Sequence, residues 1–240
     1  MNKKSITRKG FTLVEVLITL KIIGIIAAIT IPSLINNTNN STFVIGCKKA
    51  YETLNQVYYN IKADNGGDIA NALTNLSSDT DADGLANVFI SKLNVAKYCG
   101  AGTSSGGEFN TGCFANIHYK YLNGNDGTNP STASGISSIL TNDGLSYGFL
   151  TLSKNCTTDK SYPTGTISSP LYNTCGSIRI DINGPNKGPS VYGRDYFSFY
   201  ITKKGIIPYG AYPDNNSNND CSIYGGGCIS KIILEGAMNY

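Results

Sequence analysis

The sequence contains no tryptophan, one histidine and few charged residues. His118 is the single histidine, and charged side chains make up 15% of the 240 residues. The chain has no nucleophile motif and no glycine-rich phosphate loop, and one histidine leaves little material for acid–base catalysis. These absences argue against an enzyme.

The excess of positive charge is confined to the N-terminus. The formal net charge is +3, from 19 basic and 16 acidic residues. Four of the basic residues are Lys3, Lys4, Arg8 and Lys9, and without them 15 basic residues face 16 acidic ones. A near-neutral remainder offers no extended basic surface for phosphate groups. We therefore expect no nucleic-acid partner and assign the four basic residues to a targeting signal.

An apolar run follows directly after these basic residues. Between Phe11 and Ile31 only Glu15 and Lys21 are charged. A helix rises about 1.5 Å per residue, so the run is just long enough to cross a hydrocarbon core of roughly 30 Å. Basic residues on its N-terminal side place that side in the cytoplasm. We predict a single-pass inner-membrane protein whose remainder lies outside the cytoplasm.

A secretory signal and a simple membrane anchor are the alternatives for this run. A secretory signal is shorter and has small residues near a cleavage site at its far end. Here Gly10 precedes the apolar run, so a cut beside it would leave the hydrophobic segment on the mature protein. A simple anchor leaves the residues around this glycine unexplained.

The residues around Gly10 carry a family resemblance. Residues 9–15 read K-G-F-T-L-V-E, and Pro32 closes the apolar run. This segment resembles the prepilin-type cleavage and methylation motif of type IV pilins and of type II secretion pseudopilins. The resemblance implies cleavage between Gly10 and Phe11 by a prepilin peptidase, N-methylation of Phe11, and a helix-kinking proline at Pro32.

The resemblance also gives Glu15 a role in assembly. An ionised carboxylate inside a bilayer needs a partner or a proton, and the cut creates a partner, the amino group of Phe11. The resemblance implies that Glu15 of an incoming subunit neutralises the Phe11 amine of a neighbour in the filament. Lys21 departs from the family pattern, which has a small or apolar residue there. It lies six residues from Glu15 and therefore on a different helix face, and its role stays open.

A second helical pattern follows the apolar run. Its apolar stripe has spacings of three and four residues: Phe43, Cys47, Ala50, Leu54, Val57 and Ile61. The helix is expected to end before Asn65-Gly66-Gly67. We expect a leader over residues 1–10, a transmembrane or filament-core helix over 11–34, its amphipathic half over 35–65, and a disulfide-bonded head over 66–240.

The predicted fold class is α+β. Four segments are predicted to be strands: residues 146–152, 177–182, 195–202 and 205–208. In the second of them, Ile178, Ile180 and Ile182 alternate with other residues, as expected for a strand with one buried face. Short helices are expected between Asp68 and Asn94. The resemblance implies the pilin arrangement, in which an antiparallel sheet packs on the C-terminal half of the long N-terminal helix.

Seven cysteines occur in a domain that we expect to be exported, where disulfides persist. Six cysteines allow about 15 pairings. Proximity along the chain favours three pairs: Cys99–Cys113, Cys156–Cys175 and Cys221–Cys228. Cys47, on the helix stripe, would then be a buried free thiol. No two cysteines have CxxC spacing, and His118 has no cysteine at ligand spacing, which disfavours zinc.

Two oxygen-rich segments are candidate calcium sites, although no cofactor is required. Residues 79–84 match the start of an EF-hand loop, but Ile90 stands where the bidentate glutamate should be. A solvated acidic turn capping the next helix is favoured there. Asp181 and Asn183, with Asp195 further on, resemble a stretch of pseudopilin-like heads, some of which bind calcium. Turn chemistry is the favoured interpretation, and calcium stays a minority prediction.

Two classes of function remain. The leading prediction is a structural subunit (a pilin, minor pilin or pseudopilin) whose partners are other subunits, the prepilin peptidase, the inner membrane and the assembly platform. The alternative is a filament-tip binding protein, an adhesin or a DNA-uptake minor pilin. It would use the loop of residues 214–228, with Tyr209, Tyr212 and Tyr224 stacking on ligands. The motif does not separate a type IV pilus from a type II secretion system.

Overall fold

The computed structural model describes residues 10–102, 112–216 and 220–240. The predicted leader, apart from Gly10, lies outside these residues. The chain divides into two compact units, one reaching to Asn40 and the other comprising Ser41–Tyr240.

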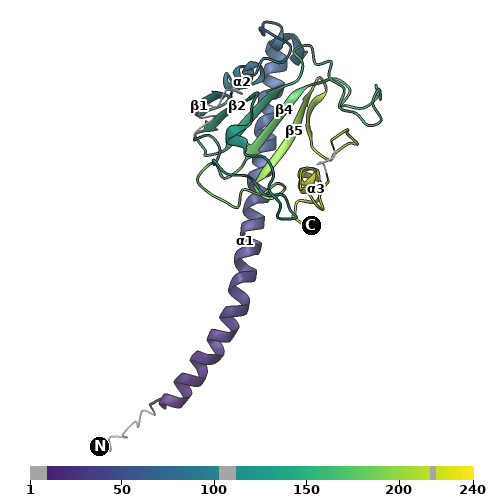
Figure 1. Ribbon diagram of the computed structural model, residues 1–240. Coiled ribbons are helices and arrows are strands. Elements are labelled where there is room, and N and C mark those ends of the chain that lie inside the picture. Colours follow the sequence, from purple (N-terminus) through teal and green to yellow (C-terminus); the bar gives the residue numbers. More distant parts are fainter. Residues whose placement is uncertain (1–9, 103–111, 217–219) are drawn as a thin grey trace, which may run out of the picture. The chain divides into compact units, whose positions relative to one another are not determined.

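One long helix, α1, runs from Leu13 to Asp64 (Figure 1). It continues through Pro32, which lacks the N–H of an internal helical residue, and through the asparagine-rich stretch that follows. Gly66 and Gly67 have positive φ, and the Gly67 amide donates to the Lys62 carbonyl at 2.8 Å. This left-handed C-terminal cap ends the helix where the glycine pair predicts it.

The larger unit contains a six-stranded antiparallel sheet in simple sequential order, β1-β2-β3-β4-β5-β6. The strands are β1 (Val95–Ala101), β2 (Ile136–Thr141), β3 (Ser146–Thr151), β4 (Thr174–Asp181), β5 (Tyr196–Thr202) and β6 (Gly205–Pro208). The predicted class, α+β with an antiparallel sheet, is confirmed.

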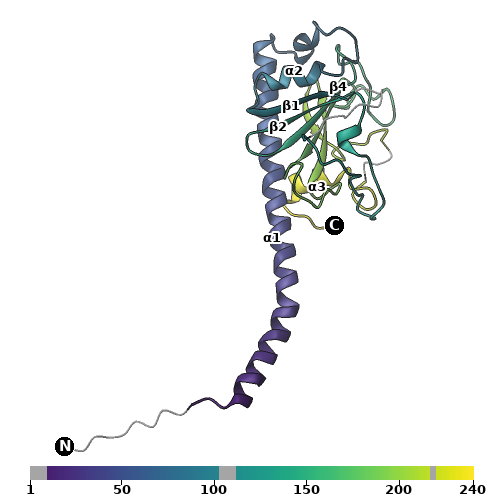
Figure 2. The same cartoon turned by 60° about the vertical axis from the view of Figure 1, so that its left-hand side comes forward.

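The C-terminal half of α1 lies along one face of the sheet (Figure 2). Leu54 and Tyr58 are fully buried against it, and the Tyr58 hydroxyl donates to the Thr202 carbonyl at 2.8 Å. Gly46 allows a close approach, because a Cβ there would lie 3.3 Å from Cδ1 of Ile182. Of the predicted apolar stripe, all members from Cys47 to Ile61 are buried and Phe43 is half-buried.

The other face of the sheet is covered by loops rather than by a helix. A small cluster of Cys113, Phe114, Tyr119 and Tyr196 is buried there. Because side chains alternate along a strand, Ile178 and Ile180 of β4 enter the helix-side core. The intervening residues, Ser177, Arg179 and Asp181, point to the loop-covered face.

The remaining helices are short. They are η1 (Ile69–Leu73), α2 (Gly84–Ile90), η2 (Pro130–Thr132) and α3 (Cys228–Glu235). The first two fulfil the expectation of short helices between Asp68 and Asn94. Asp68 caps η1 by accepting a hydrogen bond from the Ala70 amide at 3.0 Å.

Three disulfides tie the head, in the pairs that proximity along the chain favours: Cys99–Cys113, Cys156–Cys175 and Cys221–Cys228. Cys47 is free and buried under the sheet. Burial raises the pKa of its thiol well above the usual range, so the thiol stays protonated and unreactive in the folded head.

Candidate functional site

The first turn of α1 is closed by Thr12 and Glu15. The Thr12 amide and hydroxyl each donate to Oε2 of Glu15 at 2.9 Å, and the Glu15 amide donates back to the Thr12 hydroxyl at 3.3 Å. This reciprocal pattern is a capping box, which satisfies amides that a helix start would otherwise leave unpaired. The carboxylate is thus held at the N-terminal end of α1, where the helix dipole favours negative charge.

Glu15 retains capacity for another partner. Both bonds from Thr12 end on Oε2, and within the part of the chain that the structure describes no hydrogen bond reaches Oε1. Lys21 is exposed and forms none of the ion pairs found among the described residues. Among the residues that the structure describes, the hydrogen-bond partner of Glu15 is therefore Thr12, and Lys21 does not neutralise it.

The segment around Glu15 is apolar on all sides and uncovered. Phe11 is 87% exposed and Leu13 is 78% exposed, and the large side chains that follow are similarly open. Leu13–Pro32 is a helical stretch long and apolar enough to cross a membrane. The hydroxyl of Thr30 donates to the Ile26 carbonyl at 2.9 Å, and Thr19 bonds Val16 in the same way, so neither hydroxyl is left unpaired in apolar surroundings.

The predicted cleavage junction precedes the helix. Gly10 and Phe11 are exposed and lie outside regular secondary structure, three and two residues before Leu13, where α1 begins. A Cβ added at Gly10 would meet no atom within 4 Å, so the glycine is not required by packing within the chain. Pro32, the other predicted assembly residue, is exposed inside α1.

An uncovered apolar helix joined to a separately packed head defines a membrane-anchored subunit whose helix needs lipid or other copies to cover it. Residues 7–31 match a family described as the prokaryotic N-terminal methylation motif. No curated protein and no solved structure matches the chain. The motif and the α+β fold support a place in the type IV pilin-like and pseudopilin family. The motif implies association with other pilin subunits and processing by a prepilin peptidase.

The predicted oxygen cluster comes together on the loop-covered side of the sheet. Asp181 accepts hydrogen bonds from the Tyr119 hydroxyl at 2.5 Å and from the Asn183 and Gly184 amides at 3.1 and 3.0 Å. Asp195 accepts from the Ser190 and Val191 amides, each at 2.7 Å. Both carboxylates therefore shape loops, as the turn interpretation expects.

These two carboxyls are fully buried and interact with each other. Burial raises the pKa of Asp181 to about 7, although the Tyr119 hydrogen bond acts in the opposite direction. Burial likewise raises the pKa of Asp195, against the bonds from the loop amides. The pair is therefore costly to ionise fully near neutral pH.

Metal-binding geometry is limited in the described residues. No group of three or more His, Cys, Asp or Glu side chains is placed there to hold an ion. In the EF-hand-like segment, Asp81 accepts from the Ser77 hydroxyl at 2.6 Å, and Asp83 accepts from the Tyr98 hydroxyl at 2.5 Å. Asp83 is the N-cap residue of α2 but makes no side-chain capping bond. Asp81 therefore serves the local turn, whereas Asp83 links this segment to β1 and does not cap α2 as expected.

The capping box is the feature that sequence reasoning missed at this site. The signal was present, because Thr12-Leu13-Val14-Glu15 has the [ST]-x-x-[DE] form ahead of an apolar run. From the sequence, Glu15 receives only the role between subunits that the family resemblance implies. The structure adds a second role within the chain.

Proposed function

We propose that this chain is a structural subunit, a pilin, minor pilin or pseudopilin, of a type IV pilus or type II secretion filament. It is cut after Gly10 and assembles through its N-terminal helix. The observation that supports this most strongly is the uncovered apolar helix whose first turn carries one oriented carboxylate. In the precursor the helix is covered by inner-membrane lipid, with the head outside the cytoplasm. In the filament it is covered by the helices of other subunits.

The geometry suggests how Glu15 would act in assembly. Cleavage creates a charged amino group at Phe11, which must enter a dry core when subunits pack together. An unpaired charge there costs several kcal/mol. Oε2 of Glu15 keeps the Thr12 bonds that hold the helix start, while Oε1 receives the Phe11 ammonium of a neighbouring subunit. The same carboxylate thus caps its own helix and pairs with the next one.

Processing is tested by the intact mass of the protein extracted from membranes that contain active prepilin peptidase. We expect loss of residues 1–10 and addition of one methyl group. Gly10→Val should block the cut, because a β-branched side chain then stands at the scissile bond. Gly24→Val is the matched control, since a Cβ there also meets no atom within 4 Å, and it should still be cut. An uncut wild-type protein would refute the proposal.

A tip-binding role is the second candidate, favoured by an open hollow at the predicted loop. The hollow, about 470 Å³ in volume, is lined by Tyr212, Asp214 and Asp220 among others, and Tyr212 is half-exposed. Tyr224 is half-buried and packs edge-to-face on Tyr121, at 5.2 Å between ring centroids. Loss of adhesion with normal filaments in a Tyr212→Ala variant would support this candidate over a purely structural one.

Calcium at Asp181, Asn183 and Asp195 is a cofactor proposal supported by the donor set. Two carboxylates and an amide oxygen suit Ca²⁺, and Oδ1 of Asn183 is buried without a hydrogen-bond partner. Bound calcium would share oxygens that already accept loop amides. A rise in melting temperature with calcium but not with magnesium, abolished in Asp195→Asn, would support the site. Identical melting in calcium and in chelator would remove it.

A further inference from the structure

A half-buried arginine stands in the loop-covered face of the sheet. Arg179 of β4 lies between Ile178 and Ile180, which enter the helix-side core, so its side chain points to the opposite face. Its partner across the ladder is Ser198 of β5. A long cation therefore sits at the centre of the sheet, where an apolar or small residue would pack more easily.

Two adjoining hollows meet at this arginine. They have volumes of about 230 and 190 Å³, and both are lined by Arg179, Tyr209 and Asn216. We call them together the arginine hollow. Lys160, Ser177 and Tyr200 line the first part, and Tyr121, Tyr192 and Ser198 line the second. The size suits one or two sugar rings rather than a macromolecular surface.

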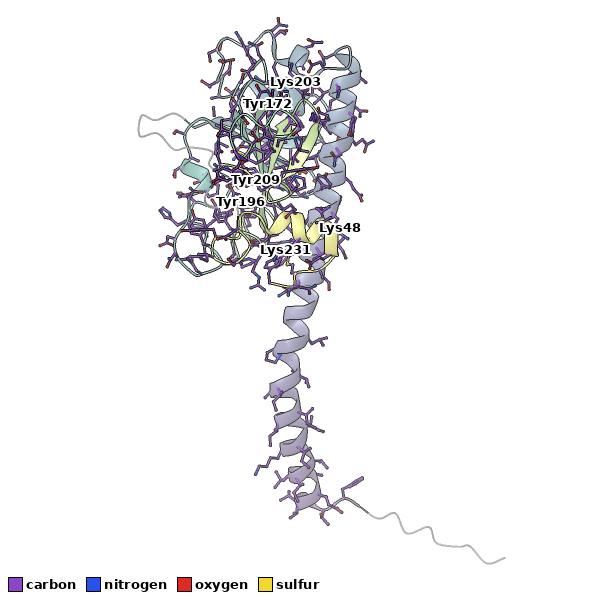
Figure 3. All side chains as sticks on the ribbon, turned by 90° about the vertical axis from the view of Figure 1, so that its right-hand side faces the viewer. Lys48, Tyr172, Tyr196, Lys203, Tyr209 and Lys231 are labelled. Carbon is purple, nitrogen blue, oxygen red and sulfur yellow. A yellow bond between two sulfur atoms is a disulfide. The ribbon has the colours of Figure 1, made fainter. Side chains whose placement is uncertain are left out.

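Arg179 has no carboxylate partner in the ion pairs found among the described residues, all four of which use lysines. The nearest acidic residue on its strand face, Asp181, is bonded to Tyr119 and to loop amides. Asp214, beside the hollow, accepts a hydrogen bond from the Tyr200 hydroxyl at 3.0 Å. The guanidinium is surrounded by tyrosines instead, Tyr196, Tyr192 and Tyr209 (Figure 3 labels the first and last).

The tyrosines form two walls, one of stacked rings and one of rings tilted by 44° to each other. Tyr200 and Tyr209 stack with ring centroids 4.1 Å apart, and Tyr121 and Tyr192 lie at 5.0 Å on the other side. Paired rings are rigid, and they present an apolar face together with a polar hydroxyl edge. Ser177 and Ser198 on the floor, with Asn216 in the wall, add short hydrogen-bonding groups. Such walls suit a ring that is apolar on its faces and hydroxylated at its edge.

We propose that the arginine hollow binds an acidic sugar, a pyranose ring that carries a carboxylate. The carboxylate pairs with the guanidinium of Arg179, whose planar fork donates two parallel hydrogen bonds to it. The sugar ring lies against the tyrosine walls, and its hydroxyls bond the serine and asparagine side chains. A nucleic acid is disfavoured because the hollow offers one arginine and one lysine, whereas backbone recognition needs a row of cations. The site lies within the head and does not depend on filament assembly.

The test uses the processed full-length protein in a polyoxyethylene detergent, which contains no sugar. Saturation-transfer NMR and calorimetry compare glucuronate with its methyl ester and with glucose. We expect glucuronate to bind roughly tenfold more tightly than the two neutral sugars, the loss that follows when a charge-assisted bidentate pair is absent. This comparison needs no variant and cannot be confounded by misfolding.

Two variants of Arg179 then test whether its guanidinium contacts the carboxylate of the sugar. Arg179→Gln should remove the preference for glucuronate, and Arg179→Lys should restore it only in part, because lysine lacks the fork. Lys231→Gln, an exposed lysine on α3, is the matched loss of charge and should bind normally. Equal binding of all three sugars, binding of none, or an unchanged preference in a folded Arg179→Gln protein would each overturn the proposal. Cleavage and filament yield of Arg179→Gln should stay at wild-type levels, which separates this result from the filament role.

Discussion

At the scale of single residues, several of the few charged side chains have specific hydrogen-bond partners. Glu15 caps its own helix through Thr12, although the motif around it points to a partner on another subunit. The proposed role between subunits would use the other carboxylate oxygen, so it is compatible with the capping role. Asp181 and Asp195, by contrast, are two buried carboxyls in one region. Burial raises the pKa of both, so keeping at least one of them protonated is less costly than ionising both.

The Asp181 carboxyl predicts a pH dependence of stability. Its pKa is about 7 in the folded head and about 3.8 when unfolded, so between these values the folded state holds the extra proton. Stability should therefore fall as pH rises from about 4 to about 7, because the unfolded state gives up its proton first. Thermal melts should show a lower melting temperature at pH 8 than at pH 5.

The matched variant is Asp181→Asn, which keeps the shape and removes the titrating group. Its melting temperature should change much less over the same range. A wild-type head that grows more stable toward pH 8 would show that the carboxyl is ionised in the folded state.

At the scale of the elements, α1 and the four C-terminal strands could be predicted, and the reasons are local. The Ile178–Ile180 alternation and the Gly66-Gly67 stop are short-range signals that tertiary contacts reinforce. Two strands were missed. β1 is an edge strand with several exposed residues, and β2 has the two adjacent polar residues Ser137 and Ser138 buried, so neither shows regular alternation of polar and apolar residues. α3 was missed as well, since only its first residue, Cys228, was interpreted, as the end of a disulfide loop.

The residues of the candidate sites likewise divide into those that a local sequence pattern indicates and those that it does not. Glu15 and Gly10 stand in a motif with fixed spacing, so the sequence names them directly. Arg179 is recognisable as part of a hollow only when β4, β5 and the following loop are placed together, because its tyrosine neighbours come from distant parts of the chain. No spacing within one segment could have indicated it.

The contact of α1 with the sheet predicts the effect of filling Gly46. Gly46→Val would place a Cβ 3.3 Å from Ile182 and add two methyl groups in a packed interface. We expect a loss of roughly 1–3 kcal/mol in unfolding free energy, as overpacking usually causes. Urea unfolding of Ile45→Val, a change at a neighbouring residue that is exposed, is the control and should be near neutral. Equal stability of the two variants would mean that α1 does not pack this closely on the sheet.

The disulfides predict the behaviour of the head under reducing agent. The three bonds close segments of 14, 19 and 7 residues. Each should contribute roughly 2–4 kcal/mol, so reduction should lower the melting temperature markedly. Thiol counting on denatured, unreduced protein should find one thiol, Cys47, which should be unreactive before denaturation because it is buried and its pKa is raised. Three or more free thiols would contradict the pairing.

At the scale of the whole molecule, the two units differ in whether they bury their own apolar side chains. The head, Ser41–Tyr240, has its own core and three disulfides. The unit before it exposes nearly all its apolar side chains and carries one acid and one base between Phe11 and Pro32. Only lipid or copies of the same helix can cover such a surface. In the proposed function, lipid covers this helix in the membrane, and the helices of other subunits cover it in the filament.

The position of Lys21 in this helix leads to a prediction about filament assembly. In the proposed filament Lys21 would bring a second positive charge into the same core and would compete with the Phe11 amine for Glu15. Lys21→Ala should therefore assemble as well as the wild type or better. Loss of filaments in Lys21→Ala, with normal membrane insertion, would mean that the lysine has its own partner in the filament.

The filament yield of Glu15→Ala tests the central claim most directly. Sheared filaments and the membrane pool of processed subunit are measured together in wild type and variant. The account predicts that Glu15→Ala is inserted and cut normally but assembles poorly or not at all, because the Phe11 amine would enter the core unpaired. Normal filament yield from Glu15→Ala would contradict the account.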